Sequence, residues 1–223
     1  MSMPRRSILE QELNQLDEDI LRLASLVNEA ISQGMQALYK RDVALAHQVV
    51  ANDEPINQLR YELEQNCLKI LATQQPAASD LRKVIAAIHL AVELERIGDH
   101  AAGIARVVER LEEEAEIESL HKLPKMAERA QDMLQQAVQA FVDHDVPKAK
   151  ALFARDDKID KQYNRLFRET MLEMQDDAYI RRANYLLWVG HNLERMGDRA
   201  INIAERVVFM VTNQYIEDMV SFD

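Results

Sequence analysis

The stretch Leu94-Glu-Arg-Ile-Gly-Asp-His-Ala101 occurs a second time as Leu193-Glu-Arg-Met-Gly-Asp-Arg-Ala200. Each copy carries a glutamate and an aspartate four residues apart, which a helix would place on one face, one turn apart. A glycine precedes the aspartate in both copies, and a glycine inside a helix costs about 1 kcal/mol relative to alanine. Close helix packing or space for an ion would explain this glycine. The motif therefore predicts two helices, each presenting a chelating pair of carboxylates.

The duplication extends well beyond the motif. Asp42-Val43 aligns with Asp145-Val146, and Ile56 aligns with Ile159, at one constant offset. Past the next turn the second copy is four residues shorter. The simplest interpretation is two copies of a three-helix unit. We expect the first unit over residues 7–116 and the second over 120–215, because the acidic run at residues 112–116 cannot be buried.

Composition predicts an all-α protein. The chain of 223 residues contains only five glycines and five prolines, while Leu, Ala, Glu, Gln and Arg, which favour helices, are abundant. Apolar residues recur at helical spacing in six segments. We expect these helices over about 7–40, 42–71, 80–114, 124–143 and 145–175, and from the turn at Asp176-Asp177 to about 214. The expected N-terminal caps are Ser7, Asp42, Ser79 and Asp145, since short polar side chains bond to free backbone N–H groups.

Charge and composition exclude several classes of protein. The formal net charge of -11 argues against nucleic acid as a partner, because phosphate recognition requires a basic surface. Cys67 is the single cysteine, so the chain has no disulfide framework and no thiolate metal cluster. No stretch reaches the roughly 18 uncharged apolar residues of a membrane span, and no apolar segment follows Arg5-Arg6 as in an export signal. We expect a cytoplasmic protein.

Acidic side chains interrupt the apolar stripes of the predicted helices. Exposure usually explains a carboxylate, but here the helical spacing places it on the buried face. The oxygen-bearing residues with this spacing are Asp53, Asn57, Glu95 and Asp99 in the first half, and Asp156, Asp160, Glu194 and Asp198 in the second.

The spacing of these residues indicates that they meet in pairs of helices. In an antiparallel hairpin, residues equidistant from the turn lie side by side. The midpoint between positions 53–57 and 95–99 is Pro76, and the midpoint between 156–160 and 194–198 is Asp177. Both midpoints fall in predicted turns, so each half should gather four such side chains at one level.

Clustered carboxylates repel one another or take up protons unless a cation joins them. Oxygen ligands without Cys or His suit magnesium, calcium, manganese or iron, and zinc or nickel remain open. The alternative is that the carboxylates form ion pairs with Arg96, Arg195 or Arg199, or line a groove open to water. His89 and His100 lie on their helix at positions that rotate away from the acidic face.

Enzymatic activity is disfavoured. Di-iron oxidases use Glu-x-x-His, and here the third residue after each motif glutamate is Gly98 or Gly197. The five glycines are scattered, so no phosphate-binding loop is formed. We expect a binding protein and keep a helical carboxylate-metal enzyme as the alternative.

The chain resembles the PhoU family of bacterial phosphate signalling. The resemblance rests on the two opening motifs, on Gln75-Pro-Ala-Ala-Ser-Asp-Leu-Arg82 and on Asn202-Ile-Ala-Glu205, and it covers nearly the whole chain. It implies two three-helix bundles, metal ions or clusters at the E/D-x-x-x-D motifs and frequent dimerisation. It also implies a cytoplasmic negative regulator that links the ATPase of the phosphate ABC transporter to the sensor histidine kinase of the phosphate regulon.

The residues that match the family's motifs are Asp53, Glu95, Asp99, Asp156, Asp160, Glu194 and Asp198. Asn57 stands where the family pattern has a carboxylate, so the first site should be the weaker one. The resulting expectation is a metal-binding adaptor and homodimer that represses the phosphate-starvation response, modulates phosphate uptake and meets the inner membrane through its partners. An accessory protein of a different phosphate transporter is a further alternative.

Overall fold

The computed structural model describes residues 5–111, 120, 122–174 and 179–215. Within these residues the chain forms α-helices and no β-strand, which confirms the all-α prediction. The helices are α1 (Arg5–Lys40), α2 (Val43–Ala51), α3 (Asp53–Gln74), α4 (Ala78–Arg110), α5 (Leu123–Asp143), α6 (Val146–Ala151), α7 (Phe153–Glu173) and α8 (Ile180–Thr212). None of them is long and apolar enough to cross a membrane.

Two of the expected helices are each broken into two, so the prediction of continuous helices over 42–71 and 145–175 was wrong. The first break is at Asn52, between α2 and α3. Pro55 has no N–H to donate to the carbonyl of Ala51 and so interrupts the helical ladder. The second break is at Leu152, whose N–H bonds to Ala149 O at 3.2 Å in a tighter turn. Both breaks place an acidic residue of the candidate sites in the first turn of a new helix.

Two of the four predicted caps are confirmed. Asp42 and Asp145 accept hydrogen bonds from Leu45 N and Lys148 N, each at 2.9 Å. The other two predictions were wrong. Helix α1 already includes Arg5, so Ser7 lies inside it, and α4 begins after Ala77, whose backbone oxygen accepts the N–H of Asp80 at 3.1 Å. At α4 a backbone bond replaces the expected serine cap.

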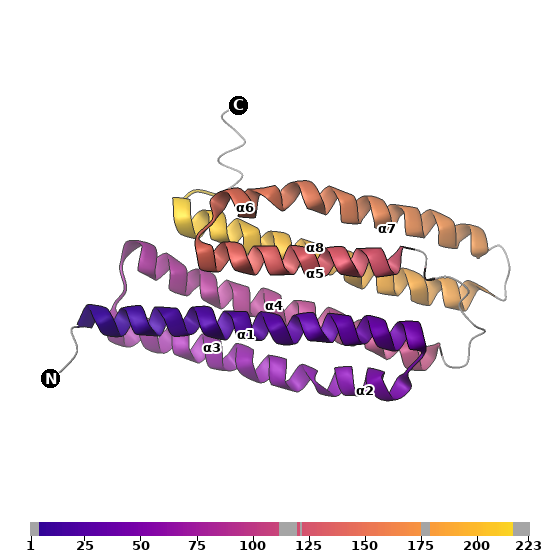
Figure 1. Ribbon diagram of the computed structural model, residues 1–223, viewed down its shortest axis with the longest axis horizontal. Coiled ribbons are helices and arrows are strands. Elements are labelled where there is room, and N and C mark those ends of the chain that lie inside the picture. The colour runs from indigo at the N-terminus through magenta and orange to yellow at the C-terminus, as the bar shows by residue number, and fades with distance from the viewer. Residues whose placement is uncertain (1–4, 112–119, 121, 175–178, 216–223) are drawn as a thin grey trace, which may run out of the picture.

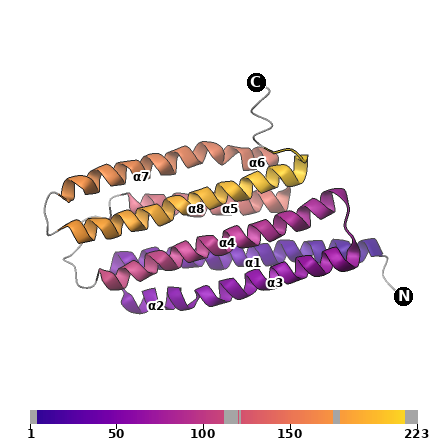
Figure 2. The same cartoon turned by 180° about the vertical axis from the view of Figure 1, so that it is seen from behind.

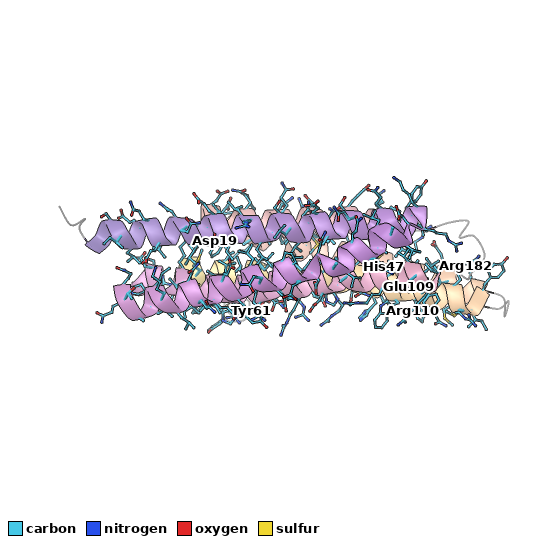
Figure 3. The ribbon with its side chains drawn as sticks, turned by 90° about the horizontal axis from the view of Figure 1, so that it is seen from below. Asp19, His47, Tyr61, Glu109, Arg110 and Arg182 are labelled. Atoms are coloured by element: carbon cyan, nitrogen blue, oxygen red, sulfur yellow. The ribbon has the colours of Figure 1, made fainter. Side chains whose placement is uncertain are left out.

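The helices assemble into two three-helix bundles that pack along their length (Figure 1). The first bundle contains α1, the pair α2 and α3, and α4, and the second contains α5, the pair α6 and α7, and α8. Figure 2 shows α4 and α8 side by side between α3 and α7, with α1 and α5 behind them. Figure 3 shows His47 of α2 near Glu109 of α4, with 3.8 Å between Nε2 and Oε2.

The two bundles share one hydrophobic core. The fully buried side chains of α4, such as Leu94, and of α8, such as Leu193, belong to the same cluster of apolar residues. The predicted boundary at residues 112–116 lies outside the described residues. The units 7–116 and 120–215 therefore stay a prediction, although the described helices divide between the two bundles as that prediction requires.

A polar seam joins α4 to α8 across this shared core. Arg199 Nη1 lies 3.4 Å from Glu93 Oε2, and Asn202 Nδ2 donates to the same oxygen at 3.2 Å. Asn192 uses its amide nitrogen to bond to Trp188 O at 2.8 Å, so its oxygen accepts from His100 Nδ1 at 3.0 Å.

The seam relates the bundles by an approximate two-fold axis. Asn192 is the repeat equivalent of Glu93, and Arg199 is the repeat equivalent of His100. The contact of Glu93 with Arg199 and the contact of Asn192 with His100 therefore join the same two positions of the repeat. On the opposite side of the molecule Gln131 Nε2 donates to Asn28 Oδ1 at 3.0 Å, and these two residues are also repeat equivalents. The duplicated sequence thus folds as a two-fold related pair within one chain.

Candidate metal sites

The predicted acidic residues meet in two grooves, one between α3 and α4 and the other between α7 and α8. The motif glycines allow these helices to approach closely. A Cβ atom on Gly98 would lie 3.2 Å from Ile56 and 3.7 Å from Asp53 Oδ1. A Cβ atom on Gly197 would lie 3.2 Å from Ile159 and 3.6 Å from Asp156 Oδ1. Each glycine therefore brings a carboxylate oxygen of the neighbouring helix to the motif backbone.

In the first site, Asp53 is the most constrained side chain. Its Oδ1 is buried without a hydrogen-bond partner, and its Oδ2 accepts from Asn57 Nδ2 at 3.4 Å. Burial, followed by repulsion from Asp99, raises the pKa of Asp53, while Arg106 and Asn57 partly oppose the increase. Burial and Asp99 also raise the pKa of Glu95. The carboxylates are thus close enough to resist simultaneous ionisation.

In the second site, the repulsion is stronger. Burial raises the pKa of Asp156 from 3.8 to about 6, with further contributions from Asp160, Asp198 and Glu194. The pKa values of Asp160 and Glu194 are also raised, first by burial and then by Asp198. Asp156 Oδ1 and Glu194 Oε2 are both buried without a hydrogen-bond partner. The structure therefore brings all four predicted side chains of the second half into one acidic cluster.

The alternative hypothesis was that Arg96, Arg195 or Arg199 neutralises the motif carboxylates, and it is met at Asp198. Arg195 Nη1 lies 2.7 Å from Asp198 Oδ2, within the same helix. By contrast, Arg96 and Arg199 both pair with Glu93, which lies outside the two sites. Of these three arginines, Arg195 alone therefore pairs with a motif carboxylate among the described residues.

The oxygen atoms of these side chains suit a cation, but some of the side chains would have to rotate in order to bind it. In the described part of the chain, no three Asp, Glu, His or Cys side chains are already arranged to hold a metal ion. Asp198 faces Arg195, and Asp99 is exposed at the rim. The buried unpartnered oxygens of Asp53, Asp156 and Glu194 are the atoms that a cation would satisfy. Hard oxygen ligands of this kind suit divalent or trivalent ions.

Some residues that lie beside the two sites were not predicted from the sequence. Arg60 Nη2 lies 3.9 Å from Glu95 Oε1 and opposes the increase in the pKa of that carboxyl. The repeat equivalent of Arg60 in the second half is Tyr163, a neutral side chain whose pKa is raised by burial and by Glu194. Aligning the two repeats position by position could have identified this difference. At the positions of Asn57 and Arg60, the second site therefore has an additional carboxylate and a neutral side chain in place of an arginine.

The histidines lie as the sequence predicted. His89 is exposed, and His100 points into the seam toward Asn192 rather than into the acidic groove. Burial lowers the pKa of His100, which favours the neutral form of its ring. A different histidine, His191, approaches the second site with Nδ1 at 3.4 Å from Glu194 Oε2 but makes no hydrogen bond to this oxygen.

Comparison with known proteins finds one family. The model of the PhoU domain matches the chain twice, at residues 20–108 and 123–207. A protein of Clostridium acetobutylicum named phosphate-specific transport system accessory protein PhoU homolog is 31% identical to the chain over 214 residues. This similarity covers 95% of the chain and 98% of that protein.

Two solved structures share the fold. The crystal structure of PhoU from Pseudomonas aeruginosa superposes with a TM-score of 0.86 at 34% identity and covers 92% of this chain and 99% of that one. The crystal structure of the phosphate transport system regulatory protein PhoU from Streptococcus pneumoniae also gives a TM-score of 0.86 at 34% identity, over 93% and 99% of the two chains.

Proposed function

Because the chain belongs to the PhoU family, we propose that it is a metal-binding, non-enzymatic accessory protein of phosphate transport that represses the phosphate-starvation response. Its relatives are named as accessory or regulatory proteins of phosphate-specific transport systems. On this proposal the chain acts in the cytoplasm, contacts the ATPase of a phosphate ABC transporter and its sensor histidine kinase, and associates with the inner membrane through them. A homodimer is part of the same proposal.

One observation carries the metal-binding part of this proposal. The second site holds two buried carboxylate oxygens without hydrogen-bond partners, on Asp156 and Glu194, in a cluster where repulsion and burial raise three carboxyl pKa values. Leaving such atoms unpaired costs about 1–3 kcal/mol each. A bound cation would satisfy them and reverse the pKa shifts.

The ligands of the second site would be Asp156, Asp160, Glu194 and Asp198. The ligands of the first site would be Asp53, Asn57, Glu95 and Asp99. Iron, manganese, magnesium, calcium, zinc and nickel are all compatible with these oxygen ligands. We expect the second site to bind more tightly, because it has one more carboxylate and has Tyr163 in place of Arg60, which makes it more negative.

Metal content tests the site assignment. Protein purified without chelator should contain bound metal by elemental analysis, and Asp156→Asn with Glu194→Gln should remove more of it than Asp53→Asn with Glu95→Gln. Both double variants keep the side-chain shape, and circular dichroism should show unchanged helix content. Equal metal content in the wild type and in both variants would contradict the assignment.

A separate experiment tests the regulatory role. Deleting the gene should switch on phosphate-starvation genes in phosphate-rich medium, and the wild-type chain should restore repression. Repression that persists in the deletion strain would refute this role without affecting the metal sites. A pull-down with the transporter ATPase and the kinase, with and without phosphate, tests the partners directly.

A further inference from the structure

The outward face of α7 differs from the acidic surface expected of a chain with net charge -11. Lys158, Lys161, Arg165 and Arg168 follow one another at intervals of three, four and three residues, so they form one stripe along the helix. All four are exposed. Arg165 pairs with Glu169 at 2.7 Å, whereas Lys158 and Lys161 have no ion-pair partner among the described residues.

Large apolar side chains flank this basic stripe. Phe167 is 45% exposed, Met171 is 46% exposed and Leu172 is 68% exposed. On the adjacent helix α8, Trp188 is 57% exposed. Trp188 is connected to α7 through His191, with ring centroids 6.4 Å apart, and His191 lies 6.1 Å from the ring of Tyr163. Trp188 thus lies beside α7 on the neighbouring helix, and we call the four basic residues together with Phe167, Met171, Leu172 and Trp188 the α7 face.

The fold itself does not require this surface. The repeat equivalents of the four basic residues on α3 are Pro55, Gln58, Glu62 and Gln65. The equivalents of Phe167 and Trp188 are Glu64 and His89. Both helices occupy the same place in their bundles, so packing alone leaves these positions free to be polar. The four basic residues, Phe167 and Trp188 therefore belong to the second half alone, whereas Met171 has an exposed apolar counterpart in Leu68 and α3 also exposes Tyr61.

We propose that the α7 face binds an anionic lipid surface directly. Lysines and arginines attract anionic headgroups, with a contribution of about 1 kcal/mol per residue near the surface. Trp, Phe and Leu beside a basic stripe are typical of helices that lie in the membrane interface, with the apolar side chains inserted among the headgroups. The acidic remainder of the molecule is repelled, so binding is confined to this face within about one Debye length, about 10 Å at 0.1 M salt.

A lipid surface fits the α7 face better than a folded protein partner. None of the grooves found among the described residues is lined by the exposed apolar side chains of this face. The two grooves of about 290 Å³ lie elsewhere, one between α1 and α5 and the other between α2 and α4. Flexible headgroups require no complementary shape, whereas a specific protein interface is closely packed at its centre.

The single tryptophan gives a direct test, since Trp188 is the only one in the chain. With a chelator present to exclude metal bridging, vesicles of phosphatidylglycerol and phosphatidylcholine should shift its fluorescence to shorter wavelength. Brominated lipid should quench it. Vesicles of phosphatidylcholine alone, or high salt, should abolish both effects.

Matched charge variants locate the surface. Lys158→Gln with Lys161→Gln should weaken partitioning into anionic vesicles by at least about tenfold. Arg22→Gln with Lys40→Gln changes the net charge equally at exposed positions of α1 in the other bundle. This control should bind within about twofold of the wild type.

Three results would overturn the proposal. These are equal binding to neutral and anionic vesicles, binding without any change in Trp188 fluorescence, and equal losses in the two charge variants. A lack of binding by the wild type would also overturn it and would leave an acidic protein as the ligand of this face. None of these results bears on the metal sites, because the assay contains chelator.

Discussion

At the scale of single residues, three pairs of equivalent positions make the two acidic sites unequal. Asn57 corresponds to Asp160 and Arg60 to Tyr163. Arg106, which opposes the pKa increase of Asp53, corresponds to Glu205. Each difference makes the first site less negative. A cation would therefore meet more carboxylates and fewer competing arginines in the second site than in the first.

The stability of the metal-free protein should depend on pH through Asp156. Its folded-state pKa of about 6 lies above that of an unfolded aspartate, about 3.9. The stability contributed by this group is full below about pH 4 and is lost as pH rises through about 6. Asp156→Asn should stabilise the metal-free protein at pH 7 by about 1 kcal/mol after allowance for solvent screening, and so raise its Tm.

The measurement is thermal unfolding followed by circular dichroism in the presence of chelator. At pH 4 the variant and the wild type should have nearly the same Tm, since the wild-type carboxyl is then protonated. A lower Tm of the variant at pH 7 would contradict the conclusion that the ionised Asp156 carboxylate destabilises the metal-free fold. Adding metal should stabilise the wild type and have less effect on the variant.

Arg195 should compete with metal for Asp198, because the two side chains form an ion pair at 2.7 Å. Arg195→Gln should strengthen metal binding at the second site by roughly fivefold, the value of a partly exposed ion pair of up to about 1 kcal/mol. The equivalent variant Arg96→Gln is the control, since Arg96 pairs with Glu93 outside the sites. Calorimetric titration that gives equal effects for the two variants would refute this competition.

The meeting of the acidic side chains could be predicted from the sequence because duplication supplied two independent examples of one pattern. Equidistance from the turns correctly brought Asp156 and Glu194 together. The neighbours Arg60 and His191 could not be recognised in the same way. Each appears once, so the duplication supplies no second example of either residue.

At the scale of elements, the seam between α4 and α8 carries the polar contacts that orient the bundles. Glu93 accepts from Asn202 and pairs with Arg199, whose side chain is 18% exposed. A partly buried arginine that loses its carboxylate leaves a charge uncompensated.

Glu93→Ala should therefore destabilise the protein by about 1–3 kcal/mol, measured by urea unfolding. Glu169→Ala is the control, because the pair of Glu169 with Arg165 involves an arginine side chain that is 62% exposed and should contribute less than about 1 kcal/mol. Combining Glu93→Ala with Arg199→Ala should recover part of the loss. Equal destabilisation by the two glutamate variants would contradict the role of the seam.

Helix positions followed from apolar periodicity, but helix breaks did not. Periodicity continues through Asn52 and Leu152, since Val49 and Ile56, on either side of the first break, both face the core. The apolar stripe therefore hides the interruption. Pro55 was a visible signal for the first break, and no comparable residue marks the second.

At the scale of the whole molecule, the shared core predicts that the two bundles depend on each other. Separately expressed chains of residues 1–116 and 117–223 should associate one to one when mixed, because each exposes a face of α4 or α8 that is buried in the intact protein. The first half alone should form a dimer in which two copies of α4 imitate the seam.

Analytical ultracentrifugation of each half and of the mixture would measure this. A first half that remains monomeric, with the Tm of the intact protein, would show that each predicted unit is an independent domain. The sequence predicted the duplication and the two units. It did not predict the contact between them, because the residues of the seam, such as Glu93 and Asn192, are polar and do not mark a buried interface.

The approximate two-fold axis has a consequence for how this protein can vary. In a homodimer every substitution appears twice, so both sites and both outer surfaces change together. Here one gene encodes both halves, and a substitution in one copy leaves the other untouched. Fusion thus permits specialisation: Asn57 opposite Asp160, and the absence on α3 of the basic stripe that α7 carries, are asymmetries that no assembly of identical subunits could inherit.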